Sequence, residues 1–149
     1  MSCSVLKGIN MKKILFAFLF LSAGCTTIHN VTPVKSAPSM GSEKNICVIN
    51  NPTTSEYFRH VMVDALEKKG FQVLIVESNH NANCPVYINY VGKWTWSFNK
   101  YLSYASIKVF DSGQEIGRAY YNAIGSNSSP ISRFKNPDTK IRELIDELF

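Results

Sequence analysis

The chain has 149 residues, of which 45% are hydrophobic and 18% are charged, and its formal net charge at pH 7 is +5. This length suits one domain with a single hydrophobic core. The basic residues are scattered among acidic ones and form no long run, which is typical of a solvated surface and argues against a nucleic-acid-binding protein.

A secretory signal peptide is indicated near the N-terminus. Lys12 and Lys13 precede the short apolar run 14–21, and small residues follow it. A membrane-spanning helix needs roughly 20 apolar residues, so this run is too short to cross a bilayer. We expect a signal peptide over residues 1–24, with translation starting at Met11. Loss of its three lysines lowers the net charge of the mature chain from +5 to +2.

The signal ends in a cysteine that an ordinary export signal does not need. The segment LSAGC (21–25) resembles the bacterial lipobox, although its large aliphatic residue stands one position earlier than is commonest. The resemblance implies that Cys25 receives a diacylglycerol on its thiol and an acyl chain on its new amino group. Several acyl chains, at about 0.8 kcal/mol per buried methylene, give a stable anchor. In lipoproteins of this kind an aspartate after the cysteine favours the inner membrane. Thr26 stands at that position, so the resemblance implies the periplasmic side of the outer membrane.

Residues 25–44 comprise this lipidated cysteine and a segment with Pro, Ser, Thr and Gly but no periodicity. Such a composition predicts a flexible tether between membrane and domain. We expect the remainder, residues 45–149, to form a single globular domain.

The first part of that domain predicts a strand, a helix and a second strand. The apolar runs 45–50 and 71–77 predict buried strands. Thr53 and Glu56 form a capping box at the start of the helix, and Gly70 ends it. A crossover of this length makes the two strands parallel. The buried stripe of the helix consists of Phe58, Val61, Met62, Ala65 and Leu66.

The second part predicts three antiparallel strands and a final helix. Segments 85–96, 101–110 and 114–124 are rich in aromatic and β-branched residues, and an Asp-Ser-Gly turn joins the last two. Asn136 caps the final helix and Pro137 takes its first position. The expected fold class is α+β, a two-layer arrangement in the order β-α-β-β-β-α, with a single mixed sheet and both helices on one face. The buried stripe of the final helix consists of Ile141, Leu144, Ile145 and Leu148.

Two cysteines remain for the domain, Cys47 and Cys84. An even pair in an oxidising compartment predicts a disulfide, which contributes about 4 kcal/mol by loop-closure entropy. The alternative is a metal-binding pair, but no histidine stands nearby at ligand spacing.

Trp94 and Trp96 are the strongest local signal for binding. They are two residues apart, so both project from one face of a strand. Two interpretations are open, because the rings either fill the space between sheet and helices or form a platform for sugar, peptide or lipid. We favour the core for both, since Ile88 and Tyr90 share their face. Tyr104 on the next strand remains a possible ligand-facing residue.

The sequence contains no motif for catalysis. No glycine-rich phosphate loop follows a strand, and neither G-x-S-x-G nor H-E-x-x-H occurs. The histidines His29, His60 and His80 fall in the tether, on a helix surface and in a polar loop. We therefore predict no catalytic residue, no metal site and no cofactor, and a protein that is not an enzyme.

The segment CPVYINYVGKWTWSFNKYLSYASIKVFDSGQEIGRAYY (84–121), followed by RFKNPDTKIRELIDELF (133–149), resembles the uncharacterised Sbal-type lipoproteins of Gram-negative bacteria. Shared features are a cysteine before the first meander strand, a W-x-W pattern and a C-terminal helix ending in Leu-Phe. The family commonly has an aspartate shortly after the second Trp, where this chain has Ser97 and Phe98. The resemblance implies no particular activity.

Together these patterns predict an outer-membrane-anchored periplasmic lipoprotein that acts as a non-catalytic binding or scaffold module of the cell envelope. Its expected partners are the membrane, through the lipid anchor, and an envelope protein or polymer, with no nucleic acid. The alternatives are an enzyme or enzyme modulator acting on envelope polymers, and a surface-displayed interaction factor.

Overall fold

The computed structural model describes residues 27–77, 84–97, 99–124 and 136–149. They form six strands, two α-helices and a short 3₁₀ helix, η1 (Pro38–Met40). The strands are β1 (Ile28–Thr32), β2 (Asn45–Ile49), β3 (Gln72–Val76), β4 (Val86–Ser97), β5 (Asn99–Asp111) and β6 (Gln114–Asn122). The helices are α2 (Glu56–Lys68) and α3 (Pro137–Leu148), and no helix in the described ranges has the length and apolarity to cross a membrane.

All six strands belong to one mixed sheet with the order β1-β6-β5-β4-β2-β3. β2 runs parallel to both β3 and β4, whereas β4, β5, β6 and β1 pair in antiparallel fashion. The predicted parallel crossover and antiparallel meander are both confirmed. Ser112 and Gly113 have positive φ angles in the β5–β6 turn, which is the geometry that a two-residue hairpin requires.

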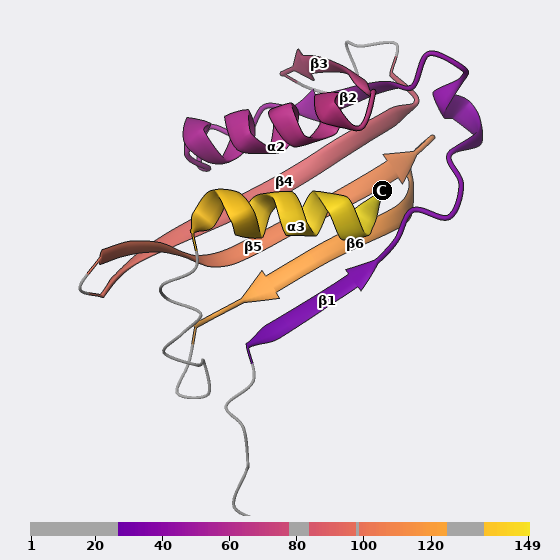
Figure 1. Cartoon of the computed structure of the whole chain (residues 1–149). Coiled ribbons are helices and arrows are strands. Elements are labelled where there is room, and N and C mark those ends of the chain that lie inside the picture. The colour runs from indigo at the N-terminus through magenta and orange to yellow at the C-terminus, as the bar shows by residue number, and fades with distance from the viewer. Residues whose placement is uncertain (1–26, 78–83, 98, 125–135) are drawn as a thin grey trace, which may run out of the picture.

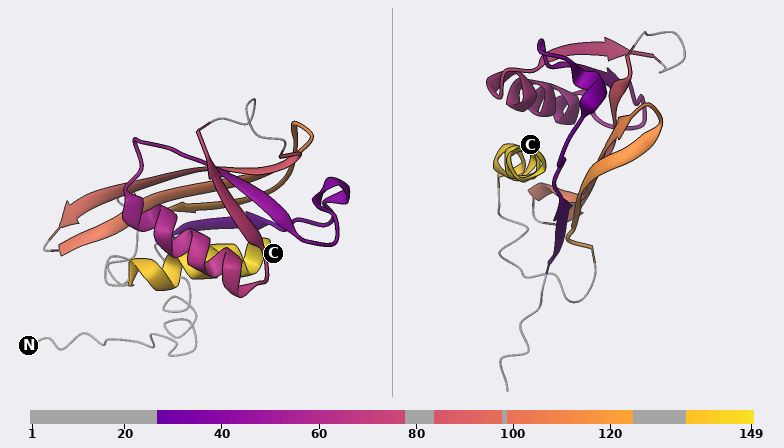
Figure 2. Two further views of the ribbon diagram at one scale, coloured as in Figure 1. Left: turned by 90° about the horizontal axis from the view of Figure 1, so that it is seen from above. Right: turned by 90° about the vertical axis from the view of Figure 1, so that its right-hand side faces the viewer.

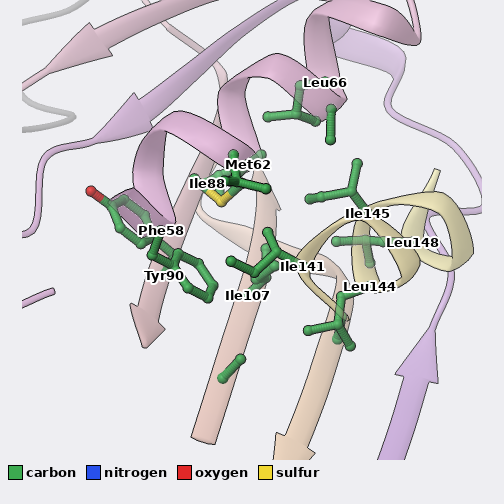
Figure 3. Close-up of a cluster of buried hydrophobic side chains, with 14 of the residues drawn as sticks. Phe58, Met62, Leu66, Ile88, Tyr90, Ile107, Ile141, Leu144, Ile145 and Leu148 are labelled. Atoms are coloured by element: carbon green, nitrogen blue, oxygen red, sulfur yellow. The ribbon is translucent and has the colours of Figure 1, made fainter. Parts of the chain in front are cut away.

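Both helices cover the same face of the sheet, as the α+β prediction required (Figure 1, Figure 2). Their apolar stripes meet the inward-facing residues of β4 and β5 in one core (Figure 3). Phe58 of α2 stacks on Tyr90 of β4 with ring centroids 5.9 Å apart. Gly92 on the same strand leaves room for this ring, since a Cβ there would lie 2.7 Å from a Phe58 ring carbon.

Ionic contacts fix the two helices side by side. Asp64 of α2 pairs with Lys68 one turn later and with Arg142 of α3. Hydrogen bonds from these two cations hold the pKa of Asp64 below its ordinary value. Lys69 and Asp146 make a second bridge of 3.2 Å between the helix pair. These exposed pairs set the orientation of the helices and add little to stability.

The disulfide prediction is confirmed. Cys47 on β2 is bonded to Cys84, which precedes β4, across a sequence separation of 37 residues. Because β2 pairs with β4 through only Cys47–Tyr87 and Val48–Ile88, the covalent bond reinforces the shortest ladder of the sheet.

The tether prediction is wrong for part of residues 25–44. Residues 28–32 form the edge strand β1, paired with β6. Beyond it, the Val34 amide donates to the Leu148 carbonyl at 2.8 Å, and the Ser39 amide donates to the Asp111 carboxylate at 3.1 Å. Hydrogen bonds from Ser39 lower the pKa of Asp111. The segment therefore docks on the sheet and on α3, a tertiary arrangement that its composition does not encode.

Two local predictions also need correction. β3 lies at the sheet edge and is not a buried strand, because Leu74 and Ile75 are 56% and 46% exposed. The N-cap of α2 is Ser55, and the predicted capping box at Thr53 does not form. The Thr53 hydroxyl instead donates to the side chain of Asn51 at 2.7 Å. The cap predicted for α3 is confirmed, since the Asn136 side chain accepts from the Asp138 amide.

Candidate functional site

The candidate site lies where the β4–β5 hairpin extends past the N-terminal ends of α2 and α3 (Figure 1, Figure 2). The helices cover the middle of the sheet, and the hairpin extends beyond the residues at which they begin. Side chains on the helix-facing side of the hairpin therefore have no helix above them. Trp94 and Trp96 stand on this part of β4.

A β-bulge marks the beginning of the protruding part. Lys93 pairs with Tyr104 whereas Trp94 pairs with Leu102, so Ser103 is an extra residue on β5. The Ser103 hydroxyl donates to the Lys93 carbonyl at 3.1 Å and accepts from the Thr95 hydroxyl at 2.8 Å. A bulge increases local twist and re-aims the side chains beyond it. The bulge at Ser103 is stabilised by these two hydrogen bonds, which connect β5 to β4.

Trp94 forms one wall of a shallow pocket of about 310 Å³. Its ring meets Tyr57 of α2 edge to face, with centroids 5.8 Å apart. The Lys100 ammonium lies 5.7 Å from the centre of the Trp94 ring, within the range of a cation–π contact. Ser55 and Pro137, which mark the starts of the two helices, complete the lining.

The indole nitrogen of Trp94 is buried but has no hydrogen-bond partner in the described part of the chain. A buried donor without a partner costs about 1–3 kcal/mol. This nitrogen has almost no accessible surface, so it is out of reach of a ligand in the pocket. The pocket thus combines two rings and a cation.

Trp96 lies farther out on the same strand and is 75% exposed. Two residues along a strand correspond to roughly 7 Å, and this distance takes the ring beyond the helices. The expectation that Trp94 and Trp96 are both core residues is therefore wrong for Trp96, and Trp94 is only partly buried. Alternation correctly placed both rings on one face, but it does not show where the covering helices end.

The structure separates Tyr104 from the two tryptophans. Tyr104 is half-buried on the opposite face of the sheet, where it meets Tyr120 edge to face at 5.4 Å. The Lys93 ammonium lies 5.6 Å from its ring centre. Tyr104 therefore does not belong to the pocket at Trp94.

Sequence reasoning missed Tyr57 and Lys100 as site residues. Tyr57 lies off the apolar stripe of α2 and is 47% exposed, which by itself predicts a surface residue. Lys100 pairs with Trp96 across the hairpin, and the residue pattern of the two strands does not by itself set this register. Two features could have identified them. One is an aromatic residue off the apolar stripe at the start of a helix, and the other is a lysine directly after a W-x-W pattern, where a hairpin would place it opposite the tryptophans.

Other predicted positions give less information about function. Cys25 and His80 lie outside the described residues. His29 is 2.8 Å from Glu147 of α3, a contact that fixes β1 against the helix. Within the described ranges, no group of three or more histidine, cysteine or acidic residues is placed to hold a metal ion.

No protein-family description and no curated protein matches this chain. Among solved structures, the PelC dodecamer from Paraburkholderia phytofirmans matches with a TM-score of 0.57 and 15% identity over 81% of this chain and 98% of the PelC chain. The dodecamer of a PelC point variant from the same organism matches with a TM-score of 0.52 and 14% identity, covering 80% of this chain and 92% of the other. At these identities the likeness shows the fold alone.

The exposure of Trp96 leads to a prediction about stability. We expect Trp96→Ala to change the free energy of unfolding by less than about 0.5 kcal/mol, as surface substitutions do. Leu144→Ala, which truncates a fully buried side chain of α3, is the control and should cost about 2–5 kcal/mol. Urea unfolding followed by circular dichroism measures both. A loss of about 3 kcal/mol at Trp96, typical of a core aromatic, would contradict the assignment.

Proposed function

We propose that this protein is a lipid-anchored, periplasmic binding module of the outer membrane, which captures a glycan polymer of the envelope without catalysing a reaction on it. The resemblance of residues 21–25 to a lipobox supports the anchor and the compartment. The aromatic pocket supports the binding activity.

The exposed Trp96 beside the half-buried Trp94 is the observation that carries this proposal. Exposing a tryptophan to water is unfavourable by about 25 cal/mol per Å² of apolar surface, so covering it with a ligand is favourable. Tryptophan is enriched among the residues that dominate binding energy, because it brings a large rigid surface.

The chemistry of the pocket favours a polyol over a purely apolar ligand. The flat rings of Trp94 and Tyr57 suit the apolar face of a sugar ring, and the Lys100 ammonium beside them suits one of its oxygens. Trp96 continues the aromatic surface along the strand, which suits a second unit of a chain. A linear glycan meets both requirements.

Binding to envelope glycan can be measured by sedimentation of the full chain with purified peptidoglycan sacculi and, separately, with lipopolysaccharide vesicles. We expect binding to at least one of the two, and a loss of affinity of about tenfold or more in Trp96→Ala, since aromatic anchors contribute 2 kcal/mol or more.

Ile28→Ala is the matched control for this experiment. It removes an exposed apolar side chain of the edge strand β1 and should bind as the unchanged protein does. Equal binding by Trp96→Ala and Ile28→Ala, or no binding to either material, would contradict the proposal.

The anchor has its own test. We expect Cys25→Ser to move the protein from the membrane fraction to the soluble fraction of cells and to abolish labelling by radioactive palmitate, because the thiol is the acceptor of the lipid. Cys84→Ser, made in parallel, removes a different thiol and should keep the label. Unchanged fractionation and labelling of Cys25→Ser would count against a lipid anchor.

Self-association into a scaffold is a second candidate function. Leu74 and Ile75 are exposed on β3, whose outer edge has no neighbouring strand in the described sheet. Unprotected edges with apolar side chains tend to pair with another strand. The two solved PelC structures are dodecamers. Native mass spectrometry of the full chain in detergent should show an oligomer that Leu74→Lys dissociates, and a monomer at all concentrations would exclude this function.

A further inference from the structure

A second cavity lies on the open face of the sheet, away from both helices. Its volume is about 460 Å³, which is within the usual range for a small-molecule site. β4 and β5 form its floor and the loop after β2 forms its rim. The residues that matter for recognition are Asn89, Ser106, Lys108 and Phe110 from the strands, and Asn50 and Asn51 from the loop.

The polar groups on the floor are not used within the protein. In the described part of the chain, the side chains of Asn89 and Ser106 make no hydrogen bond and so remain available to a ligand. Asn89 pairs directly with Lys108 across β4 and β5, so their Cβ atoms lie about 5 Å apart. Ser106 is two residues from Lys108 on the same face. The register therefore brings an amide, a hydroxyl and the base of a lysine side chain into one small area, with the Lys108 ammonium 3.7 Å from Glu115 of β6.

The charge balance beside the floor is positive. Lys108 forms an ion pair with Glu115, in which the ammonium lies 3.7 Å from a carboxylate oxygen. Glu115 accepts a hydrogen bond from Arg118, and that contact holds its pKa below the ordinary value. The Glu115 carboxylate is thus shared by two cations, Lys108 and Arg118. Lys93 on the same face has no ion-pair partner among the described residues.

The rim of the cavity does not reverse this balance. Glu77 accepts from the Asn50 amide at 3.2 Å, and Arg59 donates to the oxygen of the same side chain. The negative and positive groups offset each other there. Asn51 is occupied too, since its amide donates to the Tyr90 carbonyl at 2.8 Å. Among the polar groups of this cavity, Asn89 and Ser106 on the strands are therefore the ones without a hydrogen bond in the described part of the chain, whereas Lys108 is shared with Glu115.

An apolar wall completes the cavity. Phe110 stacks on Tyr87 with ring centroids 5.0 Å apart and an interplanar angle of 9°, which fixes the orientation of its ring. Val91 lies opposite Ser106 in the β4–β5 register. A ligand there meets a fixed aromatic ring on one side and hydrogen-bonding groups on the other.

We propose that this cavity binds an acidic sugar unit, a pyranose ring that carries a carboxylate. Lys108 pairs with the carboxylate, Asn89 and Ser106 bind ring hydroxyls, and Phe110 contacts the apolar face of the ring. The site is separate from the aromatic pocket at Trp94, because the two lie on opposite faces of the sheet, and it goes beyond the capture of a polymer by the hairpin.

D-glucuronate and D-glucose provide a matched pair of probes, since they share a ring and differ at the carboxylate. We expect ¹H–¹⁵N NMR titration of the full chain in detergent to show saturable shifts at Asn89 and Ser106 with glucuronate. Glucose and acetate should each bind at least about tenfold more weakly, because glucose lacks the carboxylate and acetate lacks the sugar ring. Loss of one charge-assisted hydrogen bond alone accounts for this factor.

Two lysine variants separate this site from the hairpin pocket. Lys108→Gln should weaken glucuronate binding about tenfold or more, whereas Lys100→Gln, which removes a cation from the other face, should leave it unchanged. Both are surface changes, and equal melting temperatures will show that both variants are folded. Equal affinity for glucuronate, glucose and acetate, unchanged binding by Lys108→Gln, or no shifts at all would overturn the proposal. Sacculus binding by Trp96→Ala tests only the proposed function of the hairpin pocket, so its outcome is independent of glucuronate binding at this cavity.

Discussion

The helix layer of this protein is shorter than the sheet that it covers. This difference in length leaves part of the sheet uncovered, and the proposed hairpin pocket lies there. The helices have 13 and 12 residues and are therefore about 20 Å long at 1.5 Å per residue. β4 and β5 have 12 and 13 residues and extend over about 40 Å at 3.3 Å per residue. Two helices lying along the strands cannot cover strands of twice their length.

The consequences differ between the two ends and faces of the sheet. Under the helices, β4 presents Ile88 and Tyr90 to a closed core, with Gly92 admitting the ring of Phe58. Past the helices, the same face presents Trp96 to solvent, and Trp94 lies half-buried at the boundary, beside Tyr57 of α2. On the opposite face no described helix lies over the strands, so amide, hydroxyl and cationic groups stay accessible there. A small α+β domain thereby exposes two distinct surfaces, each with a cavity, on a single hairpin.

The disulfide and the shared core keep this arrangement in place. The Cys47–Cys84 bond reinforces the short parallel ladder between β2 and β4. The buried stripes of α2 and α3 pack into one core, and the exposed Asp64–Arg142 pair adds a weak orienting contact between the two helices. The edge of the covered region, and with it the pocket at Trp94, is thus set by packing at a distance from the pocket.

Sequence reasoning predicted most of this fold because periodicity reports burial within each element. The stripes of α2 and α3, the parallel crossover, the meander and the disulfide all follow from local patterns. β1 was missed because His29 and Asn30 give no strand signal, and only pairing with β6 makes this segment extended. The exposure of Leu74 and Trp96 was missed for a related reason. Apolar alternation identifies a face, but strand order and helix length decide whether that face is covered.

The central claim is that the outer part of the hairpin is uncovered, and tryptophan fluorescence tests it most directly. The chain has two tryptophans, so Trp94→Phe leaves Trp96 as the only emitter. The account predicts red-shifted emission from this variant and acrylamide quenching close to that of free tryptophan. Trp96→Phe, which leaves Trp94 alone, should emit farther to the blue and be quenched less. Blue-shifted and protected emission from Trp96 would contradict the claim, because it would show that this ring is covered.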